Sequence, residues 1–128
     1  MTTWYLDSSA AMKLLTEEAE TDALASAIHS QSPFLVSCCL LDTEMRRTAH
    51  RVSVSQADVT DLLEGVDLSE VPPALFRQAG LLPGAGLRSL DAIHLVAALS
   101  LDVDVICTYD KRLAEGARNV GLPVLAPS

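Results

Sequence analysis

The chain has 128 residues, of which 49% are hydrophobic and 20% are charged, a composition typical of a folded domain rather than a disordered chain. Its 17 acidic residues outnumber its nine Lys and Arg residues and give a net charge of −8, which excludes a protein that coats nucleic acid or an anionic membrane through excess positive charge. The same acidity leaves open an enzyme that uses carboxylates to hold a metal ion. We expect a single domain over residues 1–128.

The first half of the chain alternates short apolar runs with amphipathic segments. Strands are predicted at Thr3–Leu6 and Pro33–Val36. Ser8 or Ser9 is expected to cap the first helix, and Ser37 the third. The helices of this half are predicted over Ala10–Leu15, Glu20–His29, Cys38–Val52 and Asp58–Glu64.

The second half continues the same alternation after a weak strand at Val66–Val71. Pro72 and Pro73 open a helix at the first turn, where proline is tolerated, and the Pro and Gly residues of Leu81–Gly86 predict a loop. The remaining elements are predicted as a helix over Ser89–Leu99, a strand over Val103–Cys107, a helix over Lys111–Asn119 and a strand over Leu122–Leu125. Pro123 makes the last strand an edge strand.

The predicted strands are continuous apolar runs rather than alternations of apolar and polar residues. This pattern, with helices between the strands, is typical of a parallel sheet that is covered on both faces. We therefore predict an α/β fold, a three-layer sandwich in which a small parallel β-sheet is flanked by helices. In open sheets of this kind, functional groups gather beyond the carboxyl ends of the strands.

The three cysteines, Cys38, Cys39 and Cys107, form no C-x-x-C spacing, so the sequence predicts neither a zinc site nor a disulfide framework. Cysteine usage of this kind favours a reducing cytoplasm. No apolar run approaches the ~20 residues that a membrane-spanning helix needs, and the first residues lack the basic and apolar regions of a secretory signal. We expect a cytoplasmic protein without membrane contact.

Four carboxylates are expected at the carboxyl edge of the sheet. Asp7 directly follows the first strand, and Asp110 follows the Val103–Cys107 strand. Glu44 lies beside the apolar stripe of its helix, and Asp91 lies in the first turn of another. An Asp in such a position often has only a capping role. Glu44 is harder to explain structurally, because a carboxylate beside apolar residues needs a partner.

Four acids at one edge point to a bound cation, because carboxylates held together repel each other unless a cation neutralises them. Oxygen ligands without His or Cys at metal-ligand spacing select Mg²⁺ or Mn²⁺ over zinc. Other acids do not meet this criterion: Asp42 is expected to point elsewhere on the helix of Glu44, and Asp102 and Asp104 lie at the amino end of their strand.

Four stretches, taken in order, resemble one known family. They are Leu6-Asp7-Ser8-Ser9-Ala10, Ser37 with Glu44 and Arg47, Ser89-Leu90-Asp91-Ala92-Ile93-His94-Leu95, and Thr108-Tyr109-Asp110-Lys111-Arg112-Leu113. Together they look like a PIN-domain ribonuclease and, more narrowly, a VapC-type toxin of a bacterial type II toxin–antitoxin pair. The resemblance covers essentially the whole chain. Its departures, Ser8 where Thr is common and Cys38-Cys39 where aliphatic residues are usual, affect no acid.

The resemblance implies a Mg²⁺- or Mn²⁺-dependent endoribonuclease that hydrolyses RNA phosphodiester bonds and inhibits translation or growth. The family's metal-binding acids map onto Asp7, Glu44, Asp91 and Asp110, with Asp110 completing the metal shell or orienting the attacking water. Its small hydroxyl residues map onto Ser9 and Thr108, which would hydrogen-bond the ligand carboxylates. The family also implies a homodimer and a cognate antitoxin that blocks the acidic pocket, often with a basic side chain.

Basic residues near the acids are candidates for RNA contact: Arg46, Arg47, Arg51, Arg88, Lys111 and Arg112. For the three on the helix of Glu44, the alternative is a solvated face that pairs with acids such as Asp42. His94, one turn after Asp91, is expected to be a partly buried helix residue rather than a catalytic one. The apolar helices before Ser30 and after Ser55 are candidate antitoxin surfaces.

Two other functions are compatible with this fold class. One is a catalytically silent PIN-like protein-binding module, although acids at all four positions argue against silence. The other is a phosphotransfer or phosphatase domain with Asp7 as nucleophile. Such domains require a second Asp close to the first and a Lys after a later strand, whereas here Ser8 and Ser9 follow Asp7, and Lys111 follows Asp110.

Overall fold

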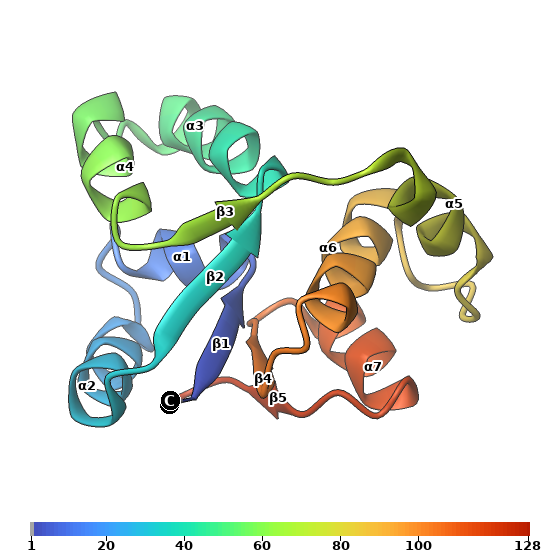
Figure 1. The fold of residues 1–128 in the computed structure, drawn as a ribbon. Helices are drawn as coiled ribbons and strands as arrows, with labels where there is room; N and C mark the ends of the chain where they lie inside the picture. Colours follow the sequence, from blue (N-terminus) through green and yellow to red (C-terminus); the bar gives the residue numbers. More distant parts are fainter. Residues whose placement is uncertain (1) are drawn as a thin grey trace.

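The computed structural model describes residues 2–128, in which seven helices surround a five-stranded sheet (Figure 1). The strands are β1 (Thr3–Leu6), β2 (Phe34–Cys38), β3 (Asp67–Ser69), β4 (Val105–Cys107) and β5 (Val124–Leu125). The helices are α1 (Ser8–Lys13), α2 (Thr21–Gln31), α3 (Leu40–Val52), α4 (Gln56–Leu63), α5 (Pro73–Leu81), α6 (Ser89–Ser100) and α7 (Lys111–Asn119).

All neighbouring strands of the sheet are parallel, in the order β3-β2-β1-β4-β5. The central strand β1 pairs through Tyr5 with Val36 of β2, and through Leu6 with Cys107 of β4. Because the strands are parallel, their carboxyl ends meet at one edge, where the chain turns from strand to helix. The predicted edge strand is confirmed, since β5 pairs with β4 alone.

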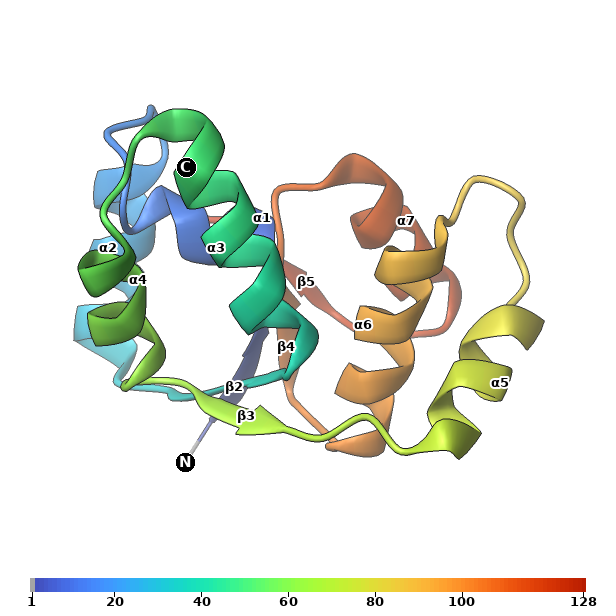
Figure 2. The same cartoon turned by 90° about the horizontal axis from the view of Figure 1, so that it is seen from above.

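The helices form a layer on each side of the sheet (Figures 1 and 2). Consecutive residues of a strand face opposite sides, so Leu6 packs with Met45 and the other apolar residues of α1–α4, whereas Tyr5 packs with Leu95 of α6 and Leu113 of α7. Helix α5 packs against α6 in a third cluster. The predicted three-layer α/β sandwich is therefore confirmed.

Two predicted helix caps are wrong. Asp7, and not Ser8 or Ser9, is the N-cap of α1, because its carboxylate accepts a hydrogen bond from the backbone N–H of Ala10 at 2.9 Å. Ser37 caps no helix and lies inside β2, where its hydroxyl donates to the carbonyl of Leu6 at 2.7 Å. A serine beyond four apolar residues thus serves as an inter-strand link rather than as a cap.

Several element boundaries also differ from the prediction. The strands β3, β4 and β5 are shorter than predicted, and β4 begins only at Val105, three residues after Asp102, which has a left-handed φ of 53°. Helix α1 ends at Lys13, two residues early. Helix α4 begins two residues early, because the hydroxyl of Ser55 accepts a hydrogen bond from the backbone N–H of Asp58.

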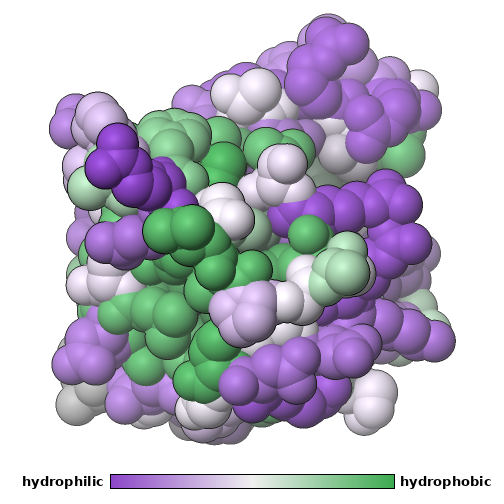
Figure 3. Space-filling view, turned by 90° about the vertical axis from the view of Figure 1, so that its right-hand side faces the viewer, coloured by the Kyte–Doolittle hydropathy of each residue, from purple (hydrophilic) through white to green (hydrophobic). Residues whose placement is uncertain are grey.

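The outer face of the α5–α7 layer is mixed in polarity, and Figure 3 shows hydrophobic side chains gathered on one part of it, beside hydrophilic ones. Phe76 and Leu81 of α5 and Leu90 and Leu99 of α6 are large apolar side chains that remain exposed. Over residues 2–128, no helix has both the length and the apolar character needed to cross a membrane.

Candidate active site

The four predicted acids, Asp7, Glu44, Asp91 and Asp110, line one cavity of about 290 Å³. They come from four different places in the chain: the β1–α1 junction, α3, α6 and the β4–α7 junction. The cavity is completed by Ser8, Ser9, Arg88, Leu90, His94 and Arg112. The parallel topology therefore brings together the residues that the sequence analysis placed at the carboxyl edge of the sheet.

Asp7 is buried, with 4% of its surface exposed, and is held by several donors. The hydroxyl of Ser9 lies 2.8 and 2.9 Å from its two carboxylate oxygens, and the hydroxyl of Thr108 donates to Oδ2 at 2.6 Å. Burial raises the pKa of Asp7, whereas the hydrogen bonds from Thr108, Ala10 and Ser9 act in the opposite direction. Ser9 and Thr108 thus contact a carboxylate of the site, as the family resemblance implied.

Asp110 is fixed by the start of α7. Its Oδ1 accepts hydrogen bonds from the backbone N–H groups of Arg112 at 2.8 Å and Leu113 at 3.1 Å, so Asp110 is the N-cap of this helix. Its own N–H donates to the Thr108 hydroxyl at 3.0 Å. Thr108 therefore connects Asp110 to Asp7.

Glu44 reaches the cavity from α3 and pairs with His94 of α6 through Oε1 and Nε2. His94 was expected to be partly buried, but only 2% of it is exposed, and its Nδ1 lies 2.7 Å from the hydroxyl of Tyr5. Burial lowers the pKa of His94, but its contacts with Cys38 and Glu44 outweigh this effect and raise the pKa to about 10. His94 is the partner that the carboxylate of Glu44 requires.

Asp91 lies in the first turn of α6, where its side chain is half-buried. Its pKa is raised, first by burial and then by the negative charge of Asp110, with Glu44 acting in the same direction. A positive charge in the cavity would relieve this repulsion. The electrostatics of the site therefore favour a cation.

The predicted basic residues fall into two groups. Arg88 and Arg112 line the acidic cavity. Arg46 instead donates from Nε to Asp42 at 2.5 Å, and its guanidinium group also reaches Gln56 and Thr60 of α4. The pairing of Arg46 with Asp42 that the solvated-face alternative names is present.

Three further basic side chains lie outside the cavity. Arg47 on α3 and Lys111 at the start of α7 are exposed, and neither lines the acidic cavity. Arg51 donates to the hydroxyl of Thr48 at 3.0 Å on the same helix. The basic groups nearest the four acids are thus Arg88 and Arg112.

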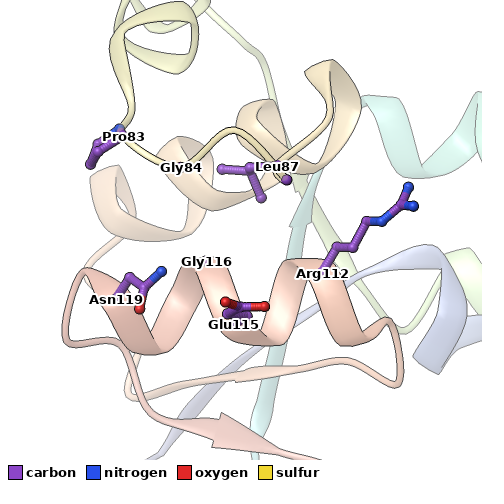
Figure 4. A pocket seen from close by; sticks show the side chains of 8 residues that line it. Pro83, Gly84, Leu87, Arg112, Glu115, Gly116 and Asn119 are labelled. Carbon is purple, nitrogen blue, oxygen red and sulfur yellow. The ribbon is translucent and has the colours of Figure 1, made fainter.

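Arg112 also borders a second, smaller cavity of about 70 Å³ between the Pro83–Leu87 loop and α7 (Figure 4). Gly116 of α7 allows the loop to pack closely, since a Cβ there would lie 2.9 Å from a methyl carbon of Leu87. This packing holds the segment that leads into Arg88. Arg88, which follows this loop, and Arg112 of α7 both line the acidic cavity.

The chemistry of the donor set fits a hard divalent cation, because the cavity presents four carboxylates and its one imidazole is already bound to Glu44. In the structure of residues 2–128, no three or more His, Cys, Asp or Glu side chains lie close enough together to hold a metal ion. The ligands would therefore have to draw together when a cation binds.

Comparison with known proteins identifies the class to which this fold and site belong. A family model described as PIN domain matches residues 4–119, so the chain belongs to the PIN-domain family. Its relatives include Ribonuclease VapC46 of Mycobacterium tuberculosis, 37% identical over 126 residues and 97% of each chain. Ribonuclease VapC35 of the same species is 34% identical over 129 residues and 96% of each chain. The resemblance to VapC-type ribonucleases is therefore confirmed over nearly the full length.

Solved structures with the same fold include a VapC toxin and a VapBC complex. VapC20 of M. tuberculosis, described as a sarcin-ricin loop cleaving toxin, superposes with a TM-score of 0.78 at 16% identity, covering 97% of this chain and 99% of that one. VapBC2 of Rickettsia felis, solved with a DNA fragment from its promoter, gives a TM-score of 0.67 at 10% identity over 99% and 100% of the two chains. At these identities the likeness concerns the fold.

Proposed function

We propose that this protein is a metal-dependent endoribonuclease and the toxin of a VapBC-type toxin–antitoxin pair. The observation that carries the proposal is the single cavity in which four carboxylates, Asp7, Glu44, Asp91 and Asp110, lie beside two arginines. Membership of the PIN-domain family and the VapC relatives support the same activity. A toxin of this kind would act in the cytoplasm, where its RNA substrate is found.

The four acids would hold Mg²⁺ or Mn²⁺. When bound, such an ion lowers the pKa of the attacking water and offsets negative charge on the phosphoryl oxygens. Asp7 supplies a carboxylate of fixed orientation, because Ser9, Ala10 and Thr108 all donate to it.

The remaining groups of the cavity act on the substrate and on water. Arg88 and Arg112 line the same cavity and supply positive charge that binds the phosphate groups of the RNA. Asp110 uses Oδ1 to cap α7, which leaves Oδ2 to orient the attacking water or to complete the metal shell. The acids bind the cation and the arginines bind RNA, so a protein of net charge −8 can still act on a polyanion.

Two protein partners belong to this proposal: a cognate antitoxin that places a basic side chain among the four acids, and a second copy of the chain in a homodimer. Exposed Leu90 lines the acidic cavity, and exposed Phe76 and Leu81 lie on the neighbouring α5, so this layer offers apolar area for a partner. The helices before Ser30 and after Ser55, α2 and α4, remain alternative antitoxin surfaces.

The test is RNA cleavage by the purified protein with Mg²⁺ or Mn²⁺. Asp91→Asn should abolish cleavage, and EDTA should stop the wild type. Asp102→Asn is a matched control, because it changes the same group at the opposite edge of the sheet, in a left-handed conformation that Asn tolerates. Equal cleavage by wild type and Asp91→Asn, or cleavage that survives EDTA, would contradict the proposal.

The alternative is a catalytically silent binding module, which the same assay separates. A silent module would bind its partner protein without cleaving RNA under any metal condition. Expression without an antitoxin gives a second readout. We expect growth arrest with the wild type and normal growth with Asp91→Asn.

A further inference from the structure

His94 is a buried polar residue for which the proposed chemistry has no role. Both of its ring nitrogens are engaged: Nδ1 lies 2.7 Å from the hydroxyl of Tyr5, and Nε2 contacts Oε1 of Glu44. The thiol of Cys38 lies 3.7 Å from Nδ1. The three polar side chains form one row, Tyr5–His94–Glu44, that runs from the middle of the sheet into the acidic cavity.

The contact between His94 and Glu44 joins the two helical layers. Glu44 belongs to α3, whose apolar side packs with α1 and α4, while His94 belongs to α6 in the other layer (Figures 1 and 2). The pair thus spans the carboxyl edge of the sheet. Glu44 would otherwise project from α3 on a flexible side chain that could adopt several rotamers.

The direction of the hydrogen bond to Glu44 does not depend on the charge of His94. The phenol of Tyr5 stays protonated, because burial raises its pKa far above the usual value. A neutral imidazole that accepts from Tyr5 at Nδ1 carries its proton on Nε2. An imidazolium carries a proton on both nitrogens. In either form, Nε2 donates to Glu44.

We propose that His94 is a positioning residue that orients the carboxylate of Glu44 toward the divalent cation. By occupying Oε1, His94 directs the other oxygen, Oε2, to the ligand role; within residues 2–128, Oε2 makes no hydrogen bond. Tyr5 in turn holds the imidazole ring. This inference rests on the proposed function, and it assigns a role to two residues that touch neither RNA nor the cation.

The test measures Mn²⁺ binding to the metal-free protein by calorimetry, together with kcat and KM for RNA cleavage. His94→Leu removes both ring nitrogens, and it should weaken Mn²⁺ binding by about 10- to 100-fold, as expected for loss of a group that orients a metal ligand. His94→Gln keeps an N–H donor near the position of Nε2, and its affinity should stay within about threefold of wild type. Any loss of cleavage should appear in kcat, larger for His94→Leu than for His94→Gln, with KM for RNA nearly constant.

Tyr5→Phe tests the second link of the row with a matched control. It removes only the hydroxyl that holds His94, and we expect a loss of Mn²⁺ affinity of about three- to tenfold, smaller than for His94→Leu. Tyr109→Phe is the control, because its hydroxyl donates to the carbonyl of Pro127 at 2.7 Å rather than to His94. Its Mn²⁺ affinity should match the wild type.

Two results would overturn the proposal: wild-type affinity in folded His94→Leu, or His94→Gln as weak as His94→Leu. Tighter Mn²⁺ binding in His94→Leu would also overturn it, since His94 would then hold Glu44 away from the cation. If His94→Leu does not fold, Tyr5→Phe decides, and wild-type affinity there refutes the proposal. Failure of the proposed function is a separate outcome, in which the wild type itself cleaves no RNA with Mn²⁺.

Discussion

The four carboxylates of the cavity are held in two different ways. Asp7 and Asp110 each follow a strand and cap the helix that begins next, so backbone N–H groups two or three positions further along the chain bind them. Glu44 projects from the middle of a helix, and His94, its partner, lies 50 positions away in the sequence. The pKa of Asp91 is raised by burial and then by the negative charge of Asp110.

This difference divides the site into two halves. Asp7 and Asp110 are rigid, because a capping carboxylate cannot rotate away without breaking the hydrogen bonds that start its helix. Glu44 and Asp91 are placed by the packing of α3 and α6 around the sheet. The first half needs only a strand–Asp–helix sequence, whereas the second requires the complete fold.

The largest effect should come from Asp7, where capping and ligand roles coincide. Asp7→Asn keeps a good capping oxygen but removes the charge, so we expect stability within about 1 kcal/mol of wild type. RNA cleavage should fall by at least about 100-fold, the upper range for loss of a group that only supports a metal ligand. Asp7→Ala should lose cleavage equally and should also be less stable than Asp7→Asn by about 1 kcal/mol, because Ala supplies no capping oxygen. Urea unfolding and cleavage rates measure the two effects.

The pair of variants separates the two roles of Asp7. If Asp7→Asn were as unstable as Asp7→Ala, the negative charge and not the cap would stabilise α1. If Asp7→Asn cleaved RNA at the wild-type rate, Asp7 would be a cap alone.

Thr108→Val should give the next largest effect, because Thr108 connects the two rigid acids. Valine has nearly the same shape but no hydroxyl, so Oδ2 of Asp7 loses a donor and the N–H of Asp110 loses its acceptor. At a site with 1% exposure, we expect a loss of about 1–3 kcal/mol. Cleavage should fall by about 10- to 100-fold. Thr108→Ser restores the hydroxyl and should recover most of the activity; failure to do so would show that the hydroxyl alone does not account for the effect.

The same division explains what the sequence could predict. The strand–Asp–helix junctions at Asp7 and Asp110 can be recognised locally, and the apolar character of the strands implies a parallel sheet, so the fold and the meeting of the acids at one edge were predictable. The pairing of Arg46 with Asp42, four positions apart on one helix, was also a local alternative.

What failed depended on contacts between distant elements. Ser37 resembles a helix cap because it follows an apolar run, but pairing with β3 keeps the chain extended through Cys38. The partnership of His94 with Glu44 could not be deduced from spacing, since it requires α3 and α6 to meet beyond the sheet. A signal did exist: a carboxylate beside an apolar stripe requires a donor, and His94 is the one polar residue between Ala92 and Leu99 of its helix.

The smallest effect is on stability: besides losing cleavage, Asp91→Asn should change how the stability of the metal-free protein depends on pH. The pKa of Asp91 is raised in the folded chain, by burial and by the charge of Asp110, so between its ordinary pKa and the raised value the folded state binds more protons than the unfolded state. Stability of the metal-free wild type should therefore fall as pH rises through this window. Asn stays neutral, so the variant should be more stable at pH 7 by a few degrees in Tm, with the difference disappearing toward pH 4. Asp7 and His94, whose pKa values are also raised, change stability in the same direction but are present in both proteins, so the difference between the two melting curves isolates Asp91.

Excess Mg²⁺ should raise the Tm of the wild type more than that of the variant, because a ligand that binds only the folded state stabilises it. A variant less stable than wild type at pH 7, without metal, would mean that the helix-start position of Asp91 contributes more than the repulsion among the acids costs.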